Sequence, residues 1–132
     1  MHAADAAAHL LGIEVERVEP GGALVRMTAR SEVLNGLGML HGGALFTLAD
    51  TAMGHASNSH GLDAVAVAAS IDFLAPVAEG TVLTAHAVER HRHGRLALYE
   101  VTVSDGEGVV VAVFHGRTQV RRTAGRGAAE VP

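Results

Sequence analysis

The sequence contains no cysteine, no tryptophan and no lysine, and only 3% of its 132 residues are aromatic. The absence of cysteine excludes disulfides, thiol catalysis and thiolate metal sites. Because aromatic side chains are scarce, alanine, valine and leucine must build the core, and the hydrophobic fraction of 48% is typical of a folded globule. The length fits one domain.

Long apolar runs and a strong charge of either sign are also missing. No run of about eighteen uncharged apolar residues occurs, which argues against a membrane span. The first ten residues show no basic segment before an apolar one, so we expect no signal peptide and a cytoplasmic protein. Ten arginines against fourteen acidic residues give a net charge of −4. This balance argues against a nucleic-acid partner.

The apolar periodicity and the turn residues predict one long helix among six strands. The predicted elements are a short helix at 2–11, strands at 13–19 and 23–29, a loop at 31–40, the long helix at 41–60, and strands at 65–74, 81–89, 96–104 and 109–120. A single helix covering a curved antiparallel sheet is an α+β fold. We expect one domain over residues 1–122 and a flexible tail at 123–132, where periodicity ends.

The long predicted helix has an unusual second face. Opposite its apolar arc lie small, mostly polar residues around Asp50, namely Gly43, Thr47, Gly54 and Ser57. A solvated helix face usually carries Lys, Glu or Arg at helical spacing, and none occurs between His41 and His60. This pattern favours close contact with a ligand or a second subunit over a solvated face, which is the simpler alternative.

The start of the same helix is the second candidate feature. Gly42 and Gly43 permit close approach of a ligand, and the first N–H groups of a helix lack intrahelical partners. They suit a developing negative charge on a carbonyl oxygen. However, Gly42 and Asp50 lie about 12 Å apart along one helix. If both groups serve one site, two antiparallel copies must combine, with Asp50 of one facing Gly42 of the other.

Several motifs together resemble the hotdog-fold thioesterases of the phenylacetic acid degradation type. They are Asn35-Gly36, His41-Gly42-Gly43, Leu48-Ala49-Asp50-Thr51-Ala52, the stretch from Ser70 to Pro76 and the stretch from Phe114 to Arg117. The resemblance covers about residues 11–122. It implies the hotdog fold, a homodimer as the functional unit, a homotetramer of such dimers, and hydrolysis of a small, aryl-acetyl CoA thioester.

The resemblance also implies roles for four residues. Asp50 corresponds to the catalytic carboxylate, and Gly42 to the amide that polarises the thioester carbonyl. Asn35 corresponds to the loop amide near the thioester or the attacking water, and His41 to the residue that shapes the start of the helix. Asp50 can act as general base or as nucleophile, and we favour the base because thioesters hydrolyse readily. No cofactor is expected, since CoA belongs to the substrate.

Two further groups of residues are candidates for substrate contacts. We expect the predicted loop at 90–95 to hold the CoA phosphates through its arginines, with a solvated hairpin as the alternative; these are Arg90, Arg92 and Arg95. We expect the acyl pocket to be shaped by large apolar side chains, together with residues of the neighbouring chain; these are Phe46, Met53, Phe73 and Leu74.

Other chemistries find little support. The nine histidines match no metal-binding spacing, so no metal site is expected. There is no G-x-S-x-G motif of a serine hydrolase and no glycine-rich phosphate loop. A non-catalytic hotdog module that binds CoA or acyl groups remains the main alternative. A hydratase is a lesser one, because it would need a paired catalytic histidine and the helix start offers only His41.

Overall fold

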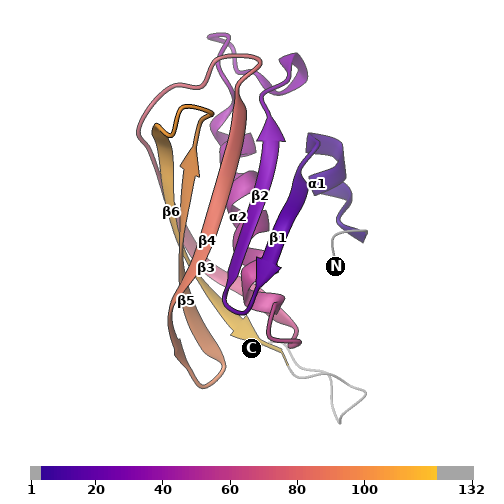
Figure 1. The fold of residues 1–132 in the computed structure, drawn as a ribbon, viewed down its shortest axis with the longest axis vertical. Helices are drawn as coiled ribbons and strands as arrows, with labels where there is room; N and C mark the ends of the chain where they lie inside the picture. Colours follow the sequence, from indigo (N-terminus) through magenta and orange to yellow (C-terminus); the bar gives the residue numbers. More distant parts are fainter. Residues whose placement is uncertain (1–3, 122–132) are drawn as a thin grey trace.

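The computed structural model describes residues 4–121 and contains one long helix packed on a six-stranded antiparallel sheet (Figure 1). In chain order the elements are α1 (Ala6–Leu11), β1 (Glu14–Glu19), β2 (Gly22–Thr28), the 3-10 helix η2 (Ser31–Val33), α2 (Gly42–Asn58), β3 (Ala64–Phe73), β4 (Val82–His93), β5 (Leu96–Ser104) and β6 (Val110–Val120). The strands lie in the order β1-β2-β4-β5-β6-β3. The predicted α+β class is confirmed.

The core lies between α2 and one face of the sheet. Alternate residues of the central strands point toward α2 and are buried, as the period of two in a strand requires; they are Ala23, Val25 and Met27 on β2, Leu83, Ala85 and Ala87 on β4, Tyr99, Val101 and Val103 on β5, and Ala112 and Phe114 on β6. The apolar arc of α2 covers them with Leu45, Leu48, Ala49, Ala52, Met53 and Ala56. Small alanine side chains on both surfaces let the helix approach the sheet closely.

Strand β3 forms one edge of the sheet. It pairs with β6 on one side only, and none of its ten residues is buried. Val67 is 40% and Phe73 is 53% exposed. A long apolar edge strand with unpaired backbone groups is a template for another strand. This edge is therefore a place where the sheet can be extended.

The predicted loop at 90–95 is wrong. β4 continues through this segment to His93, where Arg92 pairs with Ala97 and His93 with Leu96, so that only Gly94 and Arg95 form the turn. A bulge between Glu89 and His91 shifts the register and explains why the period of two is lost at this point.

The remaining boundaries differ by a few residues. Helix α1 begins at Ala6 with Asp5 as its N-cap, and residues 2 and 3 of the predicted helix lie outside the described residues. Helix α2 is flanked by His41 as N-cap and Ser59 as C-cap. The tail predicted at 123–132 lies outside the described residues. Across residues 4–121, no helix is long and apolar enough to cross a membrane.

Gly116 on β6 is required for the packing of α2. A Cβ atom added to it would overlap the Sδ of Met53, which is fully buried. We expect Gly116→Ala to lower the free energy of unfolding by about 2 kcal/mol, because overpacking forces neighbours out of place. Gly106→Ala is the matched control, since nothing lies within 4 Å of an added Cβ there. Equal urea midpoints for the two variants would contradict this packing.

Candidate active site

The start of α2 presents an amide that no described residue uses. His41 caps the helix through its Nδ1, which accepts a hydrogen bond from the Gly43 N–H at 2.8 Å. The backbone N–H groups of Leu40 and His41 donate to Val77 and Val33, both at 2.9 Å, and fix the helix start. None of the hydrogen bonds among residues 4–121 engages the Gly42 N–H. It is left as a donor at the positive end of the helix dipole.

Asn35 lies in the tight loop before this helix and has its side chain oriented by that loop. Its Oδ1 accepts hydrogen bonds from the Leu37 N–H at 2.9 Å and the Met39 N–H at 3.1 Å. Gly38 has a φ of +80°, which the turn needs and which glycine adopts without strain. Because its oxygen already accepts two hydrogen bonds, the NH₂ group of Asn35 is the part of this side chain that can donate to a ligand.

The loop and the helix start share one hollow of about 360 Å³. Asn35, Gly42, Phe73 and Leu74 all line it, so two of the expected catalytic residues and two of the expected pocket residues lie together. The Phe73 ring lies against Gly42, where an added Cβ would be 3.0 Å from its Cζ. Glycine at position 42 therefore lets an apolar wall approach the free amide closely.

Asp50 lies mid-helix, two turns further along α2, and is half-buried. No hydrogen bond or ion pair among the described residues engages its carboxylate. Burial, and then the negative charge of Asp5, raise the pKa of Asp50 above its ordinary value. A half-buried carboxylate with raised proton affinity is suited to accept a proton from water.

Within one chain these groups cannot act on one carbonyl. Eight residues of helix separate the Gly42 amide from Asp50, a distance of about 12 Å along the axis. The hollow at the helix start does not include Asp50 among its lining residues. A backbone amide without a partner among the described residues and a half-buried carboxylate thus lie at two separate places on the same helix.

Two of the expected pocket residues lie apart from the hollow. Met53 is fully buried against β6. Phe46 is half-buried and packs edge-on against Phe114, with ring centroids 5.2 Å apart and an interplanar angle of 69°. Both side chains belong mainly to the core between α2 and the sheet.

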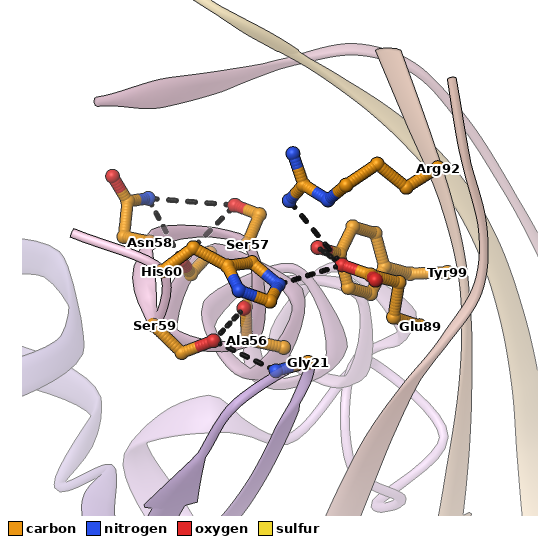
Figure 2. Close-up of polar contacts among 10 residues, drawn as sticks. Gly21, Ala56, Ser57, Asn58, Ser59, His60, Glu89, Arg92 and Tyr99 are labelled. Atoms are coloured by element: carbon orange, nitrogen blue, oxygen red, sulfur yellow. Dashed lines mark hydrogen bonds and ion pairs between the residues drawn. The ribbon is translucent and has the colours of Figure 1, made fainter. Parts of the chain in front are cut away.

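The expected phosphate-binding arginines are divided among different tasks. Arg92 Nη2 lies 3.3 Å from Glu89 Oε1, which also accepts from the Tyr99 hydroxyl at 2.7 Å and lies 3.0 Å from His60 Nε2. Figure 2 shows these three side chains converging on Glu89 at the C-terminal end of α2. Burial by itself raises the pKa of Glu89, but the contacts with Tyr99, His60 and Arg92 outweigh it and hold this pKa below its ordinary value. Arg92 therefore ties the helix end to the sheet.

Arg90 and Arg95 differ from Arg92. The Arg90 guanidinium lies 2.6 Å from Glu100 on the neighbouring strand and is exposed. Arg95 is exposed in the turn, and within residues 4–121 no acidic side chain pairs with it. Of the three arginines, Arg95 is the one whose charge the described structure leaves unneutralised.

The structure adds one residue that the sequence interpretation missed. Asp5 precedes α1, and its charge acts on Asp50 across 45 positions of sequence. An aspartate before an alanine run is an N-cap signal, so the start of the helix could have been predicted, but its contact with α2 could not. In the described part of the chain, no group of three or more His, Asp or Glu side chains is placed to hold a metal ion.

The comparisons with known proteins agree with this geometry. The family model of the thioesterase superfamily matches residues 37–112. The acyl-coenzyme A thioesterase PaaI of Escherichia coli is 43% identical over 118 residues, which cover 89% of this chain and 84% of PaaI. The solved structure of E. coli PaaI has a TM-score of 0.89 at 42% identity and covers 91% of this chain and 87% of that one.

A second relative was solved with a ligand. A hypothetical thioesterase from Streptococcus pneumoniae, determined with coenzyme A, has a TM-score of 0.79 at 30% identity, with 82% of this chain and 84% of that chain covered. The helix and sheet described above, the match of the family model and the identity to PaaI all agree. The chain belongs to the thioesterase superfamily, as a hotdog-fold thioester hydrolase of the phenylacetic acid degradation type.

Proposed function

We propose that this enzyme hydrolyses a small acyl-CoA thioester, of the aryl-acetyl class, in a site shared by two protomers. The observation that carries the proposal is the half-buried Asp50, unpaired among the described residues, on the same helix as the free Gly42 amide. The bound CoA of the S. pneumoniae relative and the PaaI name of the E. coli relative support the substrate class.

In this proposal each residue has one task. The Gly42 N–H donates to the thioester oxygen and stabilises the negative charge that develops there. Asp50 accepts a proton from the attacking water, so the water oxygen bonds to the carbonyl carbon while the C–S bond breaks and the CoA thiolate leaves. The Asn35 NH₂ group orients the water or the thioester. The same carboxylate can instead attack the carbonyl itself, as a nucleophile.

The pairing of two protomers would bring a Gly42 amide and an Asp50 carboxylate to the same thioester. A second copy adding its own β3 to the exposed β3 edge would continue the sheet and cover apolar side chains such as Val67. In such a twofold arrangement the two α2 helices run antiparallel. The carboxylate of one protomer then faces the amino end of the other helix, which removes the separation of about 12 Å.

Further parts of the proposal concern the assembly and the CoA group. We propose that two such dimers form a homotetramer, in the cytoplasm, and that no metal or cofactor is needed because water is the only co-reactant. Arg95, exposed and without an ion-pair partner among residues 4–121, is the best candidate of the three arginines for the CoA phosphates.

Asp50→Asn tests the enzymatic role. We expect free thiol release from phenylacetyl-CoA to fall by about 10²–10⁴-fold, because asparagine cannot accept the proton. The stability of the folded protein, in contrast to its activity, should increase. The folded pKa of Asp50 is raised, so ionisation costs stability once the pH exceeds the ordinary value. Asn removes that cost, and the melting temperature at pH 7 should rise.

The control for this prediction is Asp63→Asn, which removes an exposed carboxylate that lies 3.7 Å from Arg121. It should leave thiol release unchanged. Full turnover by Asp50→Asn would remove Asp50 from the mechanism. A parent protein that binds acyl-CoA without any turnover would support the non-catalytic module instead.

Gly42 allows a matched pair of variants at the amide. Gly42→Pro removes the N–H yet fits the first position of a helix, and His41 already has the extended ψ of 136° that a residue before proline prefers. Gly42→Ala adds a similar Cβ against Phe73 but keeps the N–H. We expect kcat/KM to fall about 10²-fold further in Gly42→Pro than in Gly42→Ala. Equal losses would assign the effect to crowding against Phe73.

A further inference from the structure

The hollow at the start of α2 is lined almost entirely by apolar side chains. Three of its lining residues, Leu40, Leu45 and Val77, are at most 4% exposed and belong to the core. None of the described residues that line the hollow has a charged side chain, and among them Asn35 supplies the only polar one. A charged group that entered would lose its water of hydration and find no partner of opposite charge, which is costly.

Met39 lines this hollow and has no task in the proposed mechanism. Its backbone is fixed by Asn35, because the Met39 N–H donates to Asn35 Oδ1 at 3.1 Å and the Met39 carbonyl accepts from the Asn35 N–H at 2.6 Å. An isolated β-bridge also joins Met39 to Ala78. The residue itself is half-buried. A firmly held backbone thus carries a long, unbranched side chain that can adapt its shape to a ligand.

Two large apolar residues of the hollow are left open to solvent. Phe73, at the end of β3, is 53% exposed and its ring lies against Gly42. Leu74 is 58% exposed, and its backbone N–H donates to the Val111 carbonyl at 2.8 Å. Apolar surface that is exposed inside a hollow beside a free amide is surface that a ligand can cover.

The chemistry of a thioester decides which part of it fits this hollow. In the proposed function the Gly42 N–H holds the thioester oxygen, so one of the two groups on the thioester carbon must enter the hollow. The arm of CoA carries amide groups and a hydroxyl, which need hydrogen-bond partners when they are buried. A short alkyl or aryl-acetyl group needs none. The hollow, with Asn35 as the only polar side chain among its described lining residues, therefore suits the acyl group.

We propose that this hollow receives the acyl group, that it selects short, uncharged acyl groups, and that Met39 is the specificity-determining residue that limits their length. The proposal rests on the proposed function, because it requires the thioester to lie at the Gly42 amide. The volume of about 360 Å³ is near the small end of the range of ligand pockets, which fits a short acyl group. The uncharged lining excludes an acyl group that ends in a carboxylate.

The test measures kcat/KM for butyryl-CoA, octanoyl-CoA, phenylacetyl-CoA and succinyl-CoA in the parent, Met39→Ala and Met39→Leu. We expect the parent to disfavour succinyl-CoA by at least about 10²-fold relative to butyryl-CoA, because the carboxylate would be buried without a partner. In Met39→Ala the ratio of octanoyl-CoA to butyryl-CoA should rise about 10-fold, since the shortened side chain lengthens the hollow. Met39→Leu conserves volume and should keep the parent ratio.

A ratio between two substrates is measured on one enzyme preparation, so a partial loss of folding cancels. The control is Leu10→Ala, which shortens an apolar side chain that is 76% exposed on α1 and lies outside the hollow. It should leave the ratio of octanoyl-CoA to butyryl-CoA unchanged.

Three results would overturn the proposal. They are an unchanged ratio in Met39→Ala, an equal change in Leu10→Ala, and parent turnover of succinyl-CoA that matches that of butyryl-CoA. If Asp50→Asn abolishes turnover in the same series, only the acyl selection by Met39 and the hollow has failed. If Asp50→Asn keeps full turnover, the proposed function itself has failed.

Discussion

The fixed rise of one α-helix is the constraint on which the rest of this structure depends. Helix α2 carries both a free amide at Gly42 and a half-buried carboxylate at Asp50, and its regular geometry keeps them about 12 Å apart. No change of side-chain rotamer can bring them to one carbonyl group. The exposed β3 edge offers the solution that we propose. A twofold partner paired there would place the Gly42 amide of each chain opposite the Asp50 carboxylate of the other.

The surroundings of α2 explain how a charged residue is tolerated in a helix that is otherwise part of the core. One side of α2 is closed by alanines and valines on the sheet, and Gly116 leaves room there for Met53. Its ends are anchored by polar contacts, His41 at the start and the His60–Glu89 pair at the finish. Between these anchors Asp50 is half-buried, and burial is the larger cause of its raised pKa.

Much of this arrangement could be predicted from residue types and spacing. The absence of long charged side chains between 41 and 60 argued against a fully solvated face, and Asp50 is half-buried there; the glycines at 42 and 43 indicated the free amide. The β4 segment from Arg90 to His93 could not be predicted as strand, because a bulge interrupts its alternation and its side chains are polar. The burial of Met53 depends on the absence of a Cβ at Gly116, which lies on strand β6. The effect of Asp5 on Asp50 depends on how helix α1 packs against α2. Neither leaves a local pattern.

A mixed dimer tests the shared site most directly. Chains carrying Asp50→Asn and chains carrying Gly42→Pro are joined by co-expression with two different tags, and the heterodimer is isolated. If one protomer supplies the carboxylate and its partner the amide, one site carries both substitutions and the other carries none. We expect this heterodimer to regain about half of the parent thioesterase activity, although each homodimer is inactive. A heterodimer as inactive as the two homodimers would show that both groups act within one chain, and would contradict the account.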